Sequence, residues 1–180
     1  MGGLVIRSAL YYGLKNETLW SELATKICYL GSPHHGSTLE QAGNYLDVIL
    51  EKTPFASPFA KLGKIRSAGV TDLRYGSIVD EDWEDVDRFK LQGDMRKNIP
   101  LPIGIKHNAI AGSIGKSARS VKAKLLGDNM VGINSALGKH AESDKNLNFN
   151  KRNTWVAYEC THMDLLSSAA VYIKLKSWLS

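Results

Sequence analysis

The feature that most constrains the fold is a set of short apolar runs separated by long connections. Residues 26–30 form one such run, which ends at Gly31 and Pro33. A run of this length, closed by glycine and proline, is typical of a strand buried in a parallel sheet. Residues 103–112 and 154–160 are two further strand candidates. Because long connections separate these runs, we expect parallel pairing.

Segments with helical spacing lie at both ends of the chain, over residues 3–15 and 167–179. Helices that alternate with buried strands predict an α/β layer fold, with a mostly parallel sheet and flanking helices. Three strands are fewer than the average of about five to six, so we expect the C-terminal part of a larger sheet. The residues at helical spacing are Leu4, Arg7, Ser8 and Tyr11 in the first segment, and Val171, Leu175, Trp178 and Leu179 on the inner face of the second.

A long excursion separates the first two strand candidates. A parallel crossover needs only about a dozen residues, whereas this connection runs from 31 to 102. We therefore expect a single partial domain over residues 1–180, with 39–97 as a cap or lid insertion. Residues 53–60 mix proline with aromatic side chains, a composition that suits a lid over a pocket. A surface loop is the alternative interpretation.

The composition excludes several classes of protein. Hydrophobic residues make up 43% and charged residues 23% of the 180 residues, close to the values of globular domains. No run approaches the ~18–20 apolar residues of a membrane span, so we do not expect the chain to be an integral membrane protein. Two cysteines, Cys28 and Cys160, are too few for a disulfide framework, and no secretory signal is recognisable, so we expect a cytoplasmic location.

The positive charge is mild and dispersed. A net charge of +5 arises from 23 Lys+Arg and 18 Asp+Glu, and both signs are mixed along the chain. We expect no nucleic-acid partner, because basic residues without a reading motif are common on exposed helix faces. The most basic stretch fits such a face and contains Lys116, Arg119, Lys122 and Lys124.

Polar residues follow each strand candidate, over residues 32–37, 127–131 and 161–164. In open α/β sheets, ligands bind outside the carboxyl ends of the strands. An acid in one such loop can accept a hydrogen bond from Nδ1–H of a histidine in the next, which leaves Nε2 free to take a proton. We therefore predict that Asp128 and His162 form a catalytic pair. The alternatives are that Asp128 caps a turn and that His162 is a core histidine.

No Gly-x-Ser-x-Gly motif occurs in the chain to supply the nucleophile for such a pair. The nearest match, Ala-Gly-Ser-Ile-Gly at residues 111–115, contains Ser113. A nucleophile there would need another strand and helix before the acid, because a hydrolase triad of this kind runs Ser, acid, His. The segment between Gly115 and Asp128 is too short for that path. We therefore exclude Ser113 as the nucleophile.

Four segments together resemble the C-terminal portion of an α/β-hydrolase. They are residues 1–5 (Met-Gly-Gly-Leu-Val), 30–37, 127–128 and 162–164. The resemblance is to lipase- and esterase-like bacterial members of the GPI inositol-deacylase type, and it extends over essentially the whole chain. It implies hydrolysis of a small-molecule ester or a lipid-like acyl substrate, with His162 as the base and Asp128 orienting it.

The same resemblance implies where the nucleophile lies. In such enzymes a Gly-His-Ser-Met-Gly-Gly elbow precedes a helix that begins Leu-Val. Met1 then corresponds to the residue after the nucleophilic serine, and its backbone nitrogen to an oxyanion-hole donor. The serine itself is not among the 180 residues, so we expect this chain to be inactive as written, either from a start codon placed too late or from a true truncation.

A non-enzymatic role is the second hypothesis. The chain can be a hydrolase remnant without turnover, or an interaction module that associates through an exposed sheet edge. A serine that reacts with a fluorophosphonate would separate the two hypotheses, because only the hydrolase predicts one.

The remaining polar residues are assigned to supporting roles. The resemblance implies that His34 and His35 line or brace the site, and no complete ligand set accompanies them, so we expect no metal and no cofactor. Asp164 matches a position that some bacterial lipases use for calcium, but one carboxylate does not make a calcium site. We expect His107 and His140 to be structural. Cys28 and Cys160 fit small core residues.

Overall fold

The computed structural model describes residues 1–37, 73, 75–84, 94–118 and 127–180. Most of the expected cap at 39–97, including residues 53–60, lies outside the described residues. So does the greater part of the basic helix expected after the second strand, with Arg119, Lys122 and Lys124. The described residues contain the three predicted strands and both predicted terminal helices.

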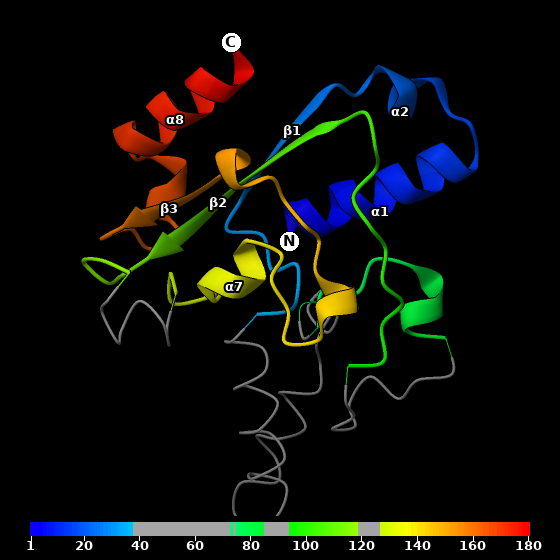
Figure 1. Cartoon of the computed structure of the whole chain (residues 1–180), viewed down its shortest axis with the longest axis horizontal. Helices are drawn as coiled ribbons and strands as arrows, with labels where there is room; N and C mark the ends of the chain where they lie inside the picture. Colours follow the sequence, from blue (N-terminus) through cyan, green and yellow to red (C-terminus); the bar gives the residue numbers. More distant parts are fainter. Residues whose placement is uncertain (38–72, 74, 85–93, 119–126) are drawn as a thin grey trace, which may run out of the picture.

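The three strands form one parallel sheet in the order β1-β2-β3. They are β1 (Lys26–Leu30), β2 (Lys106–Ser113) and β3 (Thr154–Tyr158). Leu30 lies opposite Ile110 across one pair, and Ser113 lies opposite Tyr158 across the other. The predicted α/β class with parallel strands is thus confirmed (Figure 1).

The helices are α1 (Gly2–Lys15), α2 (Leu19–Leu23), α7 (Ile133–Ala136) and α8 (Ala169–Leu179). Short 3-10 turns occupy Asp80–Asp82, Ser143–Lys145, Lys151–Asn153 and Asp164–Leu166. Helix α8 begins after Ser168, whose side chain accepts a hydrogen bond from the Val171 amide and so caps the helix. No helix in the described part of the chain has the length and apolar character needed to cross a membrane.

The expectation for the inner face of α8 was correct except at its last residue. Val171 and Trp178 are buried, whereas Leu179 is 54% exposed. Successive residues of a helix are rotated by about 100°. Because Val171 and Trp178 are two turns apart and face the sheet, Leu179 is turned away from it.

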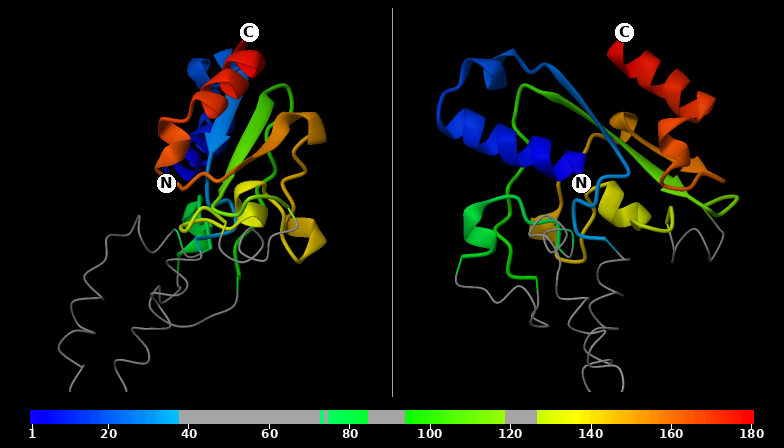
Figure 2. Two further views of the ribbon diagram at one scale, coloured as in Figure 1. Left: turned by 90° about the vertical axis from the view of Figure 1, so that its left-hand side faces the viewer. Right: turned by 180° about the vertical axis from the view of Figure 1, so that it is seen from behind.

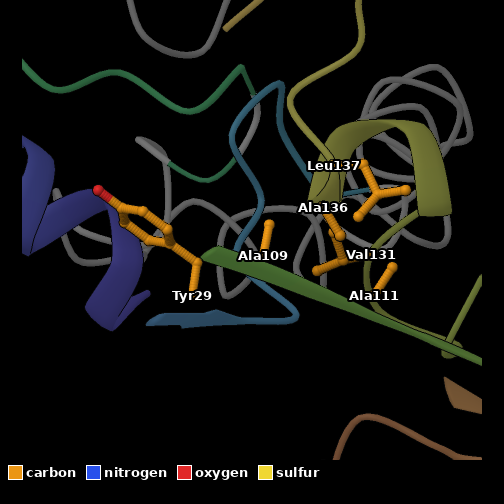
Figure 3. Packing of buried hydrophobic residues seen from close by; sticks show 6 residues of the cluster. All are labelled: Tyr29, Ala109, Ala111, Val131, Ala136 and Leu137. Carbon is orange, nitrogen blue, oxygen red and sulfur yellow. The ribbon is translucent and has the colours of Figure 1, made fainter. Parts of the chain in front are cut away.

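The central strand β2 separates two hydrophobic clusters, because alternate side chains of a strand point to opposite faces. On one face, Ala109 and Ala111 contact the segment from Val131 to Leu137, together with Tyr29 (Figure 3). On the other face, Ile110 packs with Val171 and Trp178 of α8. Figure 2 shows α8 and α7 on different sides of the strands. The two small alanines allow α7 to approach the backbone of β2 closely.

Two strand boundaries differ from those that the apolar pattern predicts. Strand β2 begins at Lys106 rather than at 103, since Gly104 has a left-handed φ of 92° and Ile103 is fully exposed. Strand β3 ends at Tyr158 rather than at 160, since Glu159 has a φ of 52°. The chain then turns back, and Cys160 forms an antiparallel bridge with Ser113. This turn directs the following residues across the end of β2.

Because Ile110 is fully buried, we expect its side chain to contribute to the free energy of unfolding. We expect Ile110→Ala to lower the free energy of unfolding by about 2–5 kcal/mol, because it removes a fully buried side chain from the contact between β2 and α8. Ile173→Ala on α8 is the matched control, since Ile173 is 67% exposed and its loss should change stability by less than about 0.5 kcal/mol. Urea denaturation measures both, and equal effects would contradict the assignment of the core.

Candidate active site

The carboxyl ends of the three parallel strands meet at one edge of the sheet, and the predicted pair lies there. The loop after β1 begins at Gly31, whose amide donates to the Ile110 carbonyl at 2.8 Å. The turn with Asp128 is joined to the end of β2 by a bond from the Ile114 amide to the Gly127 carbonyl, also 2.8 Å. His162 follows β3 through the turn at Glu159.

The two oxygens of the Asp128 carboxylate have different partners. Oδ1 accepts hydrogen bonds from the amides of Val131 at 2.8 Å and Met130 at 3.0 Å. Oδ2 lies 2.7 Å from Nδ1 of His162. Asp128 is 1% exposed, so each of these bonds lies in a medium of low polarity. The turn-capping interpretation therefore holds for Oδ1, while Oδ2 is left to orient the histidine.

His162 is fixed to the same turn through its backbone and its ring. Its amide donates to the Asp128 carbonyl at 3.1 Å, while Nδ1 contacts the carboxylate. Since a carboxylate only accepts, Nδ1 carries a proton, and in the neutral ring Nε2 then presents its lone pair. The His162 side chain is 25% exposed, unlike that of a core histidine. This geometry provides an oriented base that a reactant can reach.

Two glycines permit the close approach of these side chains, and sequence reasoning did not identify them. A Cβ at Gly112, near the end of β2, would lie 2.8 Å from Cβ of Asp128. A Cβ at Gly31 would lie 2.9 Å from Cε1 and Nδ1 of His162. Gly31 also has a φ of 54°, which disfavours other residues. Their position in the sequence, at the end of a predicted strand and before a loop with candidate site residues, is the signal that could have identified them.

The N-terminal turn of α1 lies beside the loop after β1. A Cβ at Gly3 would overlap the Ser32 hydroxyl, and Ser32 directly follows Gly31. Met1, the predicted oxyanion-hole residue, precedes the helix, and its carbonyl accepts from the Leu4 amide at 2.9 Å. Met1 is 49% exposed, and partial burial lowers the pKa of its amine. The start of α1 is thus placed one residue away from the glycine that touches His162.

His34 and His35 line a different cavity, together with Arg7 and Arg96, whose walls do not include Asp128 or His162. The His34 ring is fully buried and packs edge-on against Tyr29, with a centroid distance of 4.9 Å. The His35 ring accepts a hydrogen bond from Arg96 at Nδ1. Both histidines therefore brace the loop after β1 rather than line the Asp128–His162 pair.

The other histidines have structural partners. Nδ1 of His107 lies 3.1 Å from the Tyr29 hydroxyl, and its Nε2 lies 3.2 Å from the Pro102 carbonyl. Nδ1 of His140 accepts from the Glu142 amide at 3.0 Å. These contacts agree with the structural role expected for both residues.

Asp164 stabilises the turn that carries His162. Its Oδ2 accepts from the amide of Thr161 at 2.8 Å and from the Thr161 hydroxyl at 2.6 Å, and these bonds lower the pKa of the Asp164 carboxyl. Within the described residues no group of three His, Cys, Asp or Glu side chains is arranged to hold a metal ion. The contacts of Asp164 are those of a turn-stabilising residue.

The alternative nucleophiles are poorly placed for attack. Ser113 is fully buried, and its Oγ accepts from the Gly115 amide at 3.2 Å. Burial raises the pKa of both thiols, Cys28 and Cys160, which disfavours the reactive thiolate. These observations agree with the exclusion of Ser113 made from the sequence.

No family model, curated protein or solved structure matches this chain.

The contact between Gly31 and His162 leads to a test. We expect Gly31→Ala to lower the free energy of unfolding by about 2–4 kcal/mol, because it adds an overlap with the imidazole to the strain of a left-handed backbone. Gly104→Ala is the matched control: its φ is also left-handed, but an added Cβ would have no neighbour within 4 Å. It should cost only about 1–2 kcal/mol. Equal losses in denaturation experiments would show that the space at Gly31 does not matter.

Proposed function

We propose that this chain carries the acid and the base of a Ser-Asp-His triad that hydrolyses carboxylic esters, with a small or lipid-like acyl substrate. The observation that carries the proposal is the 2.7 Å contact between Oδ2 of the buried Asp128 and Nδ1 of the partly exposed His162. An imidazole held in this way by a carboxylate is an efficient general base toward a hydroxyl nucleophile.

The chemistry of the pair follows from the two imidazole nitrogens. Nε2 of His162 takes the proton of the attacking hydroxyl, and Nδ1–H then faces the carboxylate of Asp128 as the ring becomes positively charged. The negative charge stabilises the imidazolium, strongly so because Asp128 is shielded from water. The imidazolium then gives its proton to the departing alkoxide, which leaves as an alcohol. The acyl group is then bonded to the serine oxygen. Water, which gives a proton to the same Nε2, attacks this acyl carbon and releases the carboxylic acid and the free serine.

The nucleophile of the proposed triad is a serine that precedes Met1 in a longer polypeptide. Two features of the structure support this position. Helix α1 begins at Gly2, so a residue just before it lies at the amide-rich end of a helix, where a developing oxyanion is stabilised. The same helix end packs on Ser32, the residue that directly follows Gly31.

A groove beside the start of α1 fits an acyl chain. It has a volume of about 320 Å³, within the range of ligand pockets. Its walls are mainly apolar and include Met1, Leu4, Val5, Ile78 and Trp83. Met1, the residue that we assign to the oxyanion hole, is part of its wall.

A non-enzymatic module is the second candidate, favoured by the position of β1. Among the described strands, β1 pairs only with β2 and is an edge of the sheet. An unpaired edge can add a strand from another chain. The proposed hydrolase instead places further strands of the same polypeptide at this edge, so activity measurements separate the two.

The proposal predicts a specific effect of removing one carboxylate. In the natural translation product that contains these residues, Asp128→Asn should lower kcat for a 4-nitrophenyl ester on the order of 10⁴-fold, because the amide favours the wrong imidazole tautomer. His162→Ala should reduce kcat at least as much. Asp144→Asn is the matched control, since it removes the same charge from an exposed side chain in the 3-10 turn Ser143–Lys145 and should leave kcat within about threefold.

Fluorophosphonate labelling identifies the nucleophile in the same product. We expect a labelled serine immediately before Met1, and no labelling of residues 1–180 produced alone. Ester hydrolysis that survives His162→Ala, or a natural product that begins at Met1 and has no reactive serine, would contradict the proposed triad and favour the non-enzymatic module.

A further inference from the structure

A small polar cavity lies between α1, the loop after β1 and residues 96–99. Its volume of about 20 Å³ has room for one or two groups the size of water, which need about 10–15 Å³ each. The residues that matter here are Arg7, His34, Arg96 and Lys145, all of which line it. The proposed triad makes no use of this cavity.

Arg7 brings a buried positive charge to the cavity, and the carboxylate of Asp82, which also lines the cavity, acts on it only through space. Arg7 is 7% exposed, and its Nη2 donates to the Ile99 carbonyl at 2.8 Å. It forms no ion pair with any other described residue. Burial lowers the pKa of Arg7 to about 10, which leaves the guanidinium charged at neutral pH. A buried cation of this kind is costly unless an anion compensates it.

His34 brings an unpaired hydrogen-bonding side chain to the same cavity. It is completely buried, and neither Nδ1 nor Nε2 has a hydrogen-bond partner among the described residues. Burial, reinforced by Arg7, lowers the pKa of His34 well below its usual value, so the ring is neutral and carries one N–H donor. An unsatisfied buried donor is costly, so an acceptor in the cavity is favoured.

The carboxylates around the cavity are already occupied. Asp94 binds Arg96 at 2.7 Å and lies 3.7 Å from the ammonium of Lys145. Asp82 accepts from the amides of Ile78 and Lys97, both at 2.9 Å. The cavity walls thus include four cationic side chains (Arg7, Arg96, Lys97 and Lys145) and one carboxylate, Asp82. Arg96, Lys97 and Lys145 each pair with a carboxylate outside the walls, whereas Arg7 does not pair with any described carboxylate.

We propose that this cavity binds one small inorganic anion of the size of chloride, held by the guanidinium of Arg7 and the N–H of His34. Arg7 supplies a positive charge, His34 supplies a hydrogen-bond donor, and the cavity has the volume of such an anion. A phosphate has five heavy atoms and exceeds the space available. The proposal goes beyond the hydrolase function and does not depend on it.

Anion-dependent stability tests this proposal directly. The Tm of the chain is measured in sodium gluconate and in a series of buffers of the same ionic strength, in which chloride replaces increasing amounts of gluconate. A second series uses bromide. We expect the Tm to rise with the logarithm of the chloride concentration once this exceeds the dissociation constant, by about 3–6 °C at a tenfold excess. Identical melting temperatures in chloride and gluconate at every concentration would mean that the cavity holds only water, and would overturn the proposal.

Two variants distinguish a specific site from general screening by salt. Arg7→Met should abolish the chloride-dependent rise in Tm, whereas Lys176→Met should retain it, because Lys176 is an exposed cation on α8 outside the cavity walls. Loss of the rise in both variants would indicate screening and overturn the site. If Arg7→Met does not fold, an anomalous difference map of bromide-soaked wild-type crystals decides: a peak in the cavity supports the site, and its absence overturns it.

Discussion

The parallel pairing of three strands around β2 is the constraint on which the described structure depends. Because β1, β2 and β3 run in the same direction, their carboxyl ends lie at one edge of the sheet. Residues from three distant parts of the sequence, Gly31, Asp128 and His162, meet there as a result. The burial of β2 on both faces fixes this edge, since Ala109 and Ala111 contact the α7 side and Ile110 contacts α8.

The loop after β1 connects the two polar sites of the molecule. At its start, Gly31 contacts the His162 ring, and three residues later His34 lines the cavity beside Arg7. The carboxylate of Asp128 is satisfied by two backbone amides and one imidazole, so its burial is tolerated. In the cavity, by contrast, Arg7 has the Ile99 carbonyl as an acceptor but no paired carboxylate among the described residues, and the ring nitrogens of His34 have no described partner. The polar groups of the Asp128–His162 site are thus satisfied by one another and by the backbone, and the cavity is the site that we propose binds an anion.

Much of this arrangement was predictable from the sequence, and the exceptions have physical reasons. Strand β1 was predicted at its observed bounds, because Gly31 and Pro33 end its apolar run. The shifted ends of β2 and β3 depend on left-handed residues at Gly104 and Glu159, which apolar patterns do not reveal. The proximity of Asp128 and His162 followed from the order of parallel strands, but the division between Oδ1 and Oδ2 did not. The cavity was not foreseen, since the sequence showed Arg7 only as a residue at helical spacing.

The central claim is that Asp128 holds His162 with Nδ1 protonated and Nε2 free. The most direct test is ¹H–¹⁵N NMR of histidine-labelled protein, which requires no nucleophile or substrate. The account predicts that in the neutral ring the Nδ1 proton of His162 is strongly shifted downfield and that Nε2 is unprotonated. It also predicts that this proton signal is lost in Asp128→Asn and kept in the control variant Asp144→Asn, which changes an exposed carboxylate. A His162 ring protonated at Nε2, or a signal indifferent to Asp128→Asn, would contradict it.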